Sequence, residues 1–300
     1  MKLCYWRSKS NVRNFGDELN PWIWNRLLPG FFDNDGKVIF VGIGTLLEKR
    51  MGTHLSLPST NLDNGEPTAS RIIVFGSGAG YSEPPRLDER WKIYCVRGPL
   101  TATLLGIDGS LAVTDPALLI RRLFQTDLPK EYEFSYMPHV SNANSSWRRV
   151  CDMIGIGYVD PGWPVEKVLN GIGKSEVLVT EALHGAVVAD ALRIPWIAAS
   201  TTNNILSFKW NDWCASVALD YKPIKIAPAF MPLWNYQPGL RGMKRFRRSV
   251  KLNLVAKHLS WVARSSRPQL SKDSRIDFLT TELEDRLEKL KADASNGAFR

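Results

Sequence analysis

Short apolar runs alternate with longer segments of mixed polarity over the first part of the chain. A run of about four to eight apolar residues bounded by Gly, Pro or polar residues is typical of a buried parallel strand. Such runs predict strands at residues 2–6, 37–42, 71–75, 91–96 and 111–114. The segments between them predict helices at residues 17–28, 45–51 and 100–105. Strand, loop and helix in this repeating order predict a parallel sheet with helices on both faces.

The same alternation restarts after a polar, proline-containing connector at residues 124–133. It predicts strands at 134–137, 156–159, 177–179 and 196–199, and helices around Trp147 and at 165–171, 181–192 and 207–219. We therefore predict an α/β fold of two Rossmann-like parallel-sheet domains, residues 1–125 and 126–240, facing a cleft. Residues 241–300 are predicted to form a basic helical C-terminal extension.

The segment Glu176–Pro195 joins a predicted strand directly to a predicted helix. Thr180 occupies the position of a helix N-cap, and Pro195 stops the helix. His184 then falls in the first turn, where unpaired N–H groups and the helix dipole favour anions. A histidine at this position holds an anion or moves a proton, or it makes only a local hydrogen bond. The spacing leaves both interpretations open.

Polar residues of catalytic types follow the other predicted strands as well. The candidates are Arg13, Asn14, Asp17, Arg97, Asp115, His139, Glu181 and His184, with Lys209 on the helix at 207–219. Because the carboxyl ends of parallel strands share one edge, acids, bases and cations converge there. Each candidate also has a structural interpretation as a cap, a surface charge or a turn former. Asp115 before Pro116 is a common turn residue, for example.

Two glycine-bearing loops do not fit the nucleotide-binding motifs. The GxGxxG pattern needs a third Gly, and Leu47 and Tyr81 occupy that position in the loops that begin at Gly42 and Gly76. The GxxxxGK[ST] motif of P-loop proteins is absent as well. Tight turns and close packing of helix on sheet are therefore the expected role of most of these glycines.

The cysteines and the N-terminus indicate a cellular compartment. The four cysteines are widely separated and form no CxxC pattern, so neither a disulfide framework nor a zinc site is expected. The first residues lack the apolar segment of a signal peptide, and no run approaches ~18 apolar residues. The sequence thus predicts a cytoplasmic protein with no metal site.

The positive charge is concentrated near the C-terminus. Residues 241–267 contain nine Lys or Arg and no Asp or Glu, whereas the rest of the chain is neutral, with 39 − 9 = 30 basic and 30 acidic residues. We expect this segment to meet an anionic lipid surface, since each Lys or Arg near such a surface contributes about 1 kcal/mol. The alternative is a helix that packs between the domains. No nucleic-acid recognition module accompanies the run, so nucleic acid is not the expected partner.

A series of motifs resembles the polysaccharide pyruvyl transferase family, and most closely its exopolysaccharide branch of the succinoglycan type. In chain order they are NFGDEL (14–19), VGIG (41–44), FGSG (75–78), VRGPLTATLLG (96–106), TDP (114–116), PH (138–139) and TEALHG (180–185). Together they span roughly residues 1–220. One position departs from the family pattern, which commonly has an arginine where this chain has Ala182.

The resemblance implies a fold similar to that of the two-Rossmann-domain (GT-B-like) glycosyltransferases. It implies phosphoenolpyruvate as donor, a sugar of a lipid-linked oligosaccharide as acceptor, and a 4,6-linked pyruvate ketal as product, with no cofactor. The implied catalytic residues are His184, Asp17 and Glu181. The implied substrate-binding residues are Arg13, Asn14, Arg97, Asp115, His139 and Lys209. The alternatives are a nucleotide-sugar-dependent glycosyltransferase of the same shape and an inactive sugar-binding subunit.

The implied acceptor is anchored in a membrane, so a peripheral location on the inner face of the cytoplasmic membrane is expected. The basic segment 241–267 is the part of the chain expected to make that contact.

Overall fold

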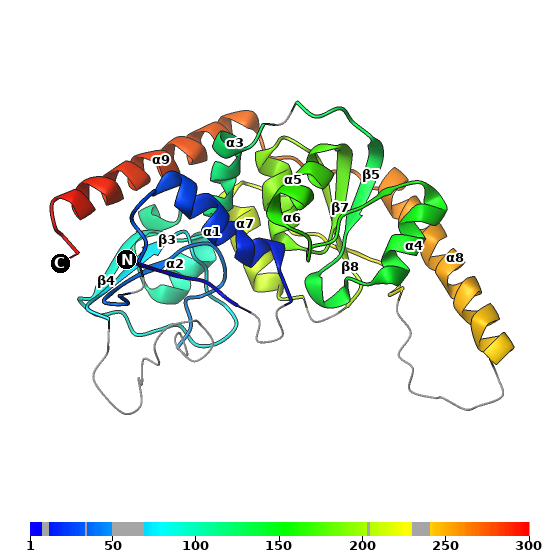
Figure 1. Ribbon diagram of the computed structural model, residues 1–300, viewed down its shortest axis with the longest axis horizontal. Helices are drawn as coiled ribbons and strands as arrows, with labels where there is room; N and C mark the ends of the chain where they lie inside the picture. Colours follow the sequence, from blue (N-terminus) through cyan, green and yellow to red (C-terminus); the bar gives the residue numbers. More distant parts are fainter. Residues whose placement is uncertain are drawn as a thin grey trace. The chain divides into compact units, whose positions relative to one another are not determined.

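The computed structural model describes residues 1–7, 12–33, 35–49, 69–125, 127–202, 205–229 and 241–299, with the backbone alone for 241–248. The chain forms two compact units (Figure 1). The first unit contains residues 1–125, 206–221 and 271–300, and the second contains residues 126–205 and 222–270. Both units therefore contain segments that are far apart in the sequence.

A four-stranded parallel sheet is the centre of the first unit. Its strands are β1 (Lys2–Cys4), β2 (Val38–Val41), β3 (Arg71–Phe75) and β4 (Trp91–Cys95), in the spatial order β1-β2-β3-β4. The helices are α1 (Phe15–Leu27), α2 (Pro99–Leu105), α3 (Ile120–Leu123), α7 (Ser207–Ser216) and α9 (Asp273–Ser295). Two 3₁₀ turns, η1 (Gly109–Leu111) and η2 (Pro116–Leu119), complete the described part of the unit.

Aromatic side chains pack α1 onto this sheet. Trp24 of α1 makes edge-to-face contacts with Phe40 and Phe75, with ring centroids 4.9 and 5.3 Å apart. All three side chains are fully buried. Such pairs add to the free energy gained from burial alone. They fix α1 against the strands.

A five-stranded parallel sheet is the centre of the second unit. Its strands are β5 (Tyr132–Met137), β6 (Gly157–Tyr158), β7 (Ser175–Thr180), β8 (Trp196–Ser200) and β9 (Ile224–Lys225), in the order β6-β5-β7-β8-β9. The helices are α4 (Ser145–Ile154), α5 (Val165–Gly173), α6 (Leu183–Ala191) and α8 (Arg241–Ser265), with a 3₁₀ turn, η3 (Val140–Asn142), after β5.

The predicted fold class is confirmed, because both sheets are parallel and lie among helices, as expected of two Rossmann-like domains. The cleft and the domain boundaries stay predictions. Within the part of the chain that the structure describes, no helix has both the length and the apolar character needed to cross a membrane.

Two of the predicted elements are wrong, and a third begins two residues later than predicted. Residues 45–49 form no helix, because Thr45 pairs with Gly78 and the Leu47 N–H donates to the Gly78 carbonyl; residues 50 and 51 lie outside the described residues. The strand predicted at 111–114 is reduced to one bridge between Ala112 and Val96, since η1 takes its first residue.

The third correction concerns the helix that carries His184. It begins at Leu183 rather than at residue 181, because Thr180 is still the last residue of β7 and Glu181 continues the sheet contacts. Ala182, not Thr180, is the N-cap residue. The Thr180 hydroxyl instead accepts a hydrogen bond from the Ala182 N–H. His184 nevertheless lies in the first turn, as predicted.

Candidate functional site

One of the two fully buried predicted acids, Glu181, lies at the carboxyl edge of the second unit's sheet. β5 and β7 are adjacent there, with Met137 opposite Thr180. Glu181 follows β7 directly, and its N–H donates to the Met137 carbonyl at 3.0 Å. Its side chain is completely buried. Burying a carboxylate costs free energy unless hydrogen bonds to the carboxylate offset that cost. The contacts of Glu181 therefore matter for its role.

The two oxygens of the Glu181 carboxylate have different surroundings. Oε2 accepts hydrogen bonds from the His139 N–H (3.0 Å) and from Nδ2 of Asn142 (2.9 Å). Asn142 also donates to the Thr201 hydroxyl of the loop after β8. Oε1 is buried and has no partner of direct hydrogen-bond geometry within the described part of the chain, but the phenol of Tyr136 lies close to the same carboxylate. One oxygen thus fixes the carboxylate to the loop after β5, and the other keeps acceptor capacity beside the Tyr136 phenol.

His139 is placed beside this carboxylate by its own loop. It is the N-cap residue of η3, and its Nδ1 accepts from the Ser141 N–H at 3.3 Å. The Ser141 hydroxyl lies 2.8 Å from the same ring nitrogen. The structure therefore brings together two of the predicted site residues, His139 and Glu181, through one hydrogen bond across 42 positions of sequence.

His184 is the second residue of α6 and is half-buried. The next residue, Gly185, allows the start of this helix to lie close to the sheet. A Cβ at position 185 would lie 2.7 Å from the Thr180 hydroxyl oxygen and 2.8 Å from the Met137 sulfur. The glycine thus keeps the first turn of α6, with its N–H groups, against the ends of β5 and β7.

Tyr136 was not among the predicted site residues, although it lies under Glu181. Its ring is fully buried and packs on Trp147 with a centroid distance of 4.6 Å. Burial first, and then the negative charge of Glu181, raise the pKa of Tyr136 well above its ordinary value. The phenol therefore stays protonated. The only sequence signal for Tyr136 is its position in an apolar strand that ends at Pro138–His139.

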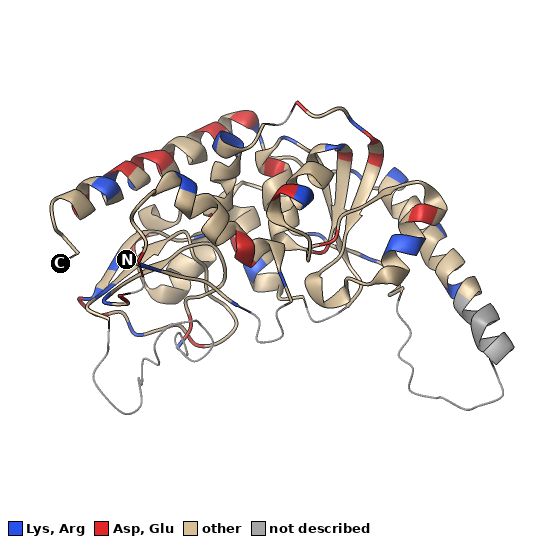
Figure 2. Ribbon diagram, viewed as in Figure 1, with Lys and Arg blue, Asp and Glu red and all other residues tan. Residues whose placement is uncertain are grey.

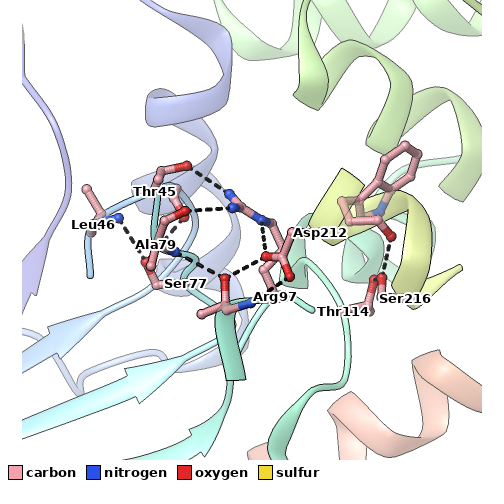
Figure 3. A network of polar contacts seen from close by, with 11 residues as sticks. Thr45, Leu46, Ser77, Ala79, Arg97, Thr114, Asp212 and Ser216 are labelled. Carbon is pink, nitrogen blue, oxygen red and sulfur yellow. Dashed lines mark hydrogen bonds and ion pairs between the residues drawn. The ribbon is translucent and has the colours of Figure 1, made fainter. Parts of the chain in front are cut away.

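The first unit holds a buried polar network at the carboxyl edge of its own sheet (Figure 3). Arg97, two residues after the end of β4, is fully buried and its Nε donates to Asp212 of α7 at 3.1 Å. Its Nη1 donates to the Thr45 hydroxyl at 2.8 Å, and its Nη2 to the Ala79 carbonyl at 3.4 Å. Asp212 also accepts from the N–H and the hydroxyl of Thr101. One guanidinium thus ties three loops and a distant helix together.

The surroundings of Arg97 leave no space for larger residues. A Cβ at Gly78 would collide with the guanidinium, and a Cβ at Gly98 would collide with the backbone carbonyl of Asp212. Close packing against Arg97 and Asp212 therefore explains these glycines of the FGSG and VRGPL motifs, and no phosphate-binding role is needed to account for them. An anion-binding role for Arg97 stays a prediction, and a guanidinium without solvent exposure that is already paired with a carboxylate fits a positioning role better.

We expect Asp212→Ala to destabilise the first unit by about 3–5 kcal/mol, the usual cost of leaving one charge of a buried ion pair without its partner. Chemical denaturation monitored by circular dichroism would measure the loss. The matched control is Glu284→Ala, which removes the exposed ion pair between Arg122 and Glu284 and should change stability far less. Equal effects of the two substitutions would contradict the structural role given to the buried pair.

The remaining predicted residues of the first unit lie in separate places. The Asn14 side chain, at the N-cap of α1, donates to Asp17 at 2.6 Å, and Arg13 beside it is exposed. Asp115 is buried and caps η2 through the Ala117 N–H. Lys209 of α7 donates to the Tyr81 hydroxyl at 3.2 Å and lies over the Tyr81 ring. The structure joins Asn14 to Asp17; the others have local contacts of their own.

Sequence reasoning missed Asn20, a buried residue on the inner face of α1. Its side chain donates to the Ile43 carbonyl at 2.9 Å and accepts from the Ile43 N–H at 2.8 Å. It therefore holds the VGIG loop after β2. Thr45, Ser77, Thr101 and Asp212 were missed in the same way. An uncharged polar residue within an apolar helix face was the signal available for Asn20.

Two comparisons with known proteins match a range of the chain that includes the carboxyl edges of both sheets. Residues 10–203 match the family described as polysaccharide pyruvyl transferase. The chain is also 40% identical, over 231 residues, to the succinoglycan biosynthesis protein ExoV of Rhizobium meliloti (strain 1021), an alignment that covers 75% of this chain and 68% of that protein. The matched range contains Arg97, His139, Glu181 and His184. The chain therefore belongs to the polysaccharide pyruvyl transferase family and is a transferase.

Proposed function

We propose that this chain transfers the pyruvyl group of phosphoenolpyruvate to a sugar of an exopolysaccharide repeat, forming a 4,6-linked ketal and releasing phosphate. The buried carboxylate of Glu181 carries the proposal. One of its oxygens is held by two N–H donors, and it stands two residues before the helix that bears His184. Membership of the family supports the pyruvyl group, and the name of the succinoglycan protein supports an exopolysaccharide as acceptor.

The reaction sets clear chemical requirements. The methylene carbon of the donor gains a proton, and the first sugar hydroxyl attacks the neighbouring carbon and loses its own proton. The bond from that carbon to the phosphate oxygen then breaks, and the second hydroxyl attacks and loses its proton. The site must therefore supply an acid for the methylene, a base for each hydroxyl, and N–H groups or cations for the departing phosphate.

The second unit offers residues for three of these tasks: a base, an acid and a contact to the departing phosphate. Glu181 is the proposed base, because its Oε1 keeps acceptor capacity beside the Tyr136 phenol and its Oε2 is fixed. His184 is the proposed acid or phosphate contact, since the first turn of α6 favours anions. His139, joined to Glu181 through its backbone N–H, is a proposed substrate-binding residue. Asp17 of the first unit is the second candidate base, held by Asn14.

The donor can be tested with purified protein, phosphoenolpyruvate and the oligosaccharide repeat isolated from the producing cell. We expect phosphate release that requires the acceptor, and one solvent-derived hydrogen in the product. In heavy water, mass spectrometry should find one deuterium per transferred pyruvyl group, because the methylene carbon becomes a methyl. Product formation that depends on a nucleotide sugar instead would overturn the donor assignment. Acceptor binding without phosphate release would indicate an inactive sugar-binding subunit.

We further propose that the acceptor is lipid-linked and that the protein works at the inner face of the cytoplasmic membrane. The basic charge of residues 241–267 supports this location, since anionic headgroups attract such segments.

A further inference from the structure

Helix α8 has two apolar faces, and only one of them is covered. The inner face packs into the core of the second unit. Its buried residues are Leu252, Val255, Ala256, Leu259, Val262 and Ala263. They contact a cluster that includes Trp147 and Val150 of α4, and Figure 1 shows the two helices side by side. Near the end of α8, Arg264 forms an exposed ion pair with Glu133 of β5 at 2.8 Å. The helix is thus firmly attached to its unit.

The opposite face carries a second apolar stripe that is open to solvent. Val250, Leu254 and Trp261 are 42%, 64% and 60% exposed. At about 100° per residue they lie within about 40° of one another around the helix axis. Large apolar side chains that share one line on a protein surface are unusual unless that surface binds another protein or a membrane. We call these three residues the outer stripe.

Positive charge surrounds the outer stripe. Lys251 and Lys257 flank it on α8, and the sequence contains no Asp or Glu between residues 221 and 272. In Figure 2, Lys and Arg appear along α8 and no acidic residue does. The combination of a line of apolar residues with one Trp, flanked by Lys, is typical of helices that lie in the plane of a membrane interface. A second copy of the same face would be repelled by like charge.

We infer that the outer stripe of α8 inserts into an anionic lipid surface, with Lys251 and Lys257 against the headgroups. α8 then lies parallel to the membrane, with Leu254 and Trp261 in the acyl boundary and its inner face still packed on the unit. The biological purpose, access to a lipid-linked acceptor, rests on the proposed function. The binding itself rests on the exposure and charge of α8 and is measured separately from turnover.

The buried cysteines make a direct test practicable. All four native cysteines are buried, and burial raises the pKa of the Cys4 thiol to about 12, so an introduced surface thiol reacts selectively. A polarity-sensitive fluorophore is attached at Leu254→Cys and, in a matched control, at Phe278→Cys. Phe278 is 54% exposed on α9 and has acidic neighbours in sequence. The probes are vesicles of phosphatidylcholine with and without phosphatidylglycerol.

We expect a blue shift at position 254 with the anionic vesicles, none at position 278, and reversal of binding by salt. The double substitution L254S/W261S should weaken vesicle partitioning about tenfold or more, since two apolar side chains lose their burial. K251E/K257E should also weaken it, whereas Phe278→Ser should not. Turnover on a soluble acceptor should be unchanged in all of these variants.

Three results would overturn the inference. They are no binding to anionic vesicles at low salt, binding that shifts the label at 278 and not at 254, and a shift at 254 caused by RNA but not by vesicles. Absence of turnover on a soluble acceptor in the wild-type protein would instead count against the proposed function. Vesicle binding does not require turnover, so the two failures are distinguishable.

Discussion

His184→Ala should reduce acceptor-dependent phosphate release below detection while the protein remains folded. Loss of a general acid typically slows a reaction by about 10²–10⁴-fold, and loss of a contact to a developing anion by about 10²–10³-fold. His184 is proposed for one of these tasks at the start of α6. Alanine is the best helix former, so the first turn of α6 should persist. Continuous measurement of phosphate with phosphoenolpyruvate and a soluble acceptor gives the rate.

The control for this substitution is His258→Ala on α8. His258 is half-buried beside Trp261 and lies outside the matched family range. It should keep normal turnover on a soluble acceptor. Circular dichroism and melting temperature should be alike for the two variants and the wild type. Near-normal turnover in His184→Ala would remove this histidine from the mechanism.

Glu181→Gln should lower kcat/KM by about 10²–10⁴-fold, the usual contribution of a general base. The amide oxygen of Gln can still accept from the His139 N–H and from Asn142, so the loop after β5 should keep its position. What the substitution removes is the ability to take a proton. The acid limb of the pH dependence of kcat/KM should therefore disappear in the variant, whereas a purely structural role would leave the shape of the profile unchanged.

Glu176→Gln is the matched control, because Glu176 lies on the same strand, β7, but is exposed. Its rate and pH dependence should equal those of the wild type. If Glu181→Gln retains both the rate and the acid limb, then Glu181 is only an anchor for the His139 loop. Asp17 would then be the remaining candidate base.

The strands were predictable because a buried parallel strand leaves a short, continuous apolar run. β3 begins and ends as predicted, and β2, β4 and β7 agree within two residues at each end. The failures occur where tertiary contacts override local pattern. Residues 45–49 have good helix formers, but their N–H groups pair with Ser77 and Gly78 of the next loop. Such pairing is invisible in a local window.

The candidate site was predictable only in part. The rule that strand ends share an edge pointed to His139, Glu181 and His184, and the structure joins the first two directly. The rule on strand ends gave no means of finding Asp212, which lies 115 positions from its partner Arg97. A buried charge pair of this kind leaves no periodic signal, so the sequence showed Arg97 as a candidate anion holder and concealed its carboxylate.

Tyr136 illustrates a second kind of omission. It belongs to the continuous buried half of β5 and has the appearance of an ordinary core aromatic, and only the nearby carboxylate of Glu181 reveals a polar partner. A phenol kept protonated beside a carboxylate stabilises that charge. Residues of this type are found from the fold rather than from the strand pattern.

Pyruvyl transfer to an exopolysaccharide can be measured as the pyruvate content of the polymer made by the producing cell. Polymer from cells that lack this protein should contain no pyruvate ketal on the affected sugar, as measured by mass spectrometry and the methyl signal in proton NMR. The wild-type protein should restore the ketal, and His184→Ala should not. An unchanged ketal content in cells without the protein would contradict the account.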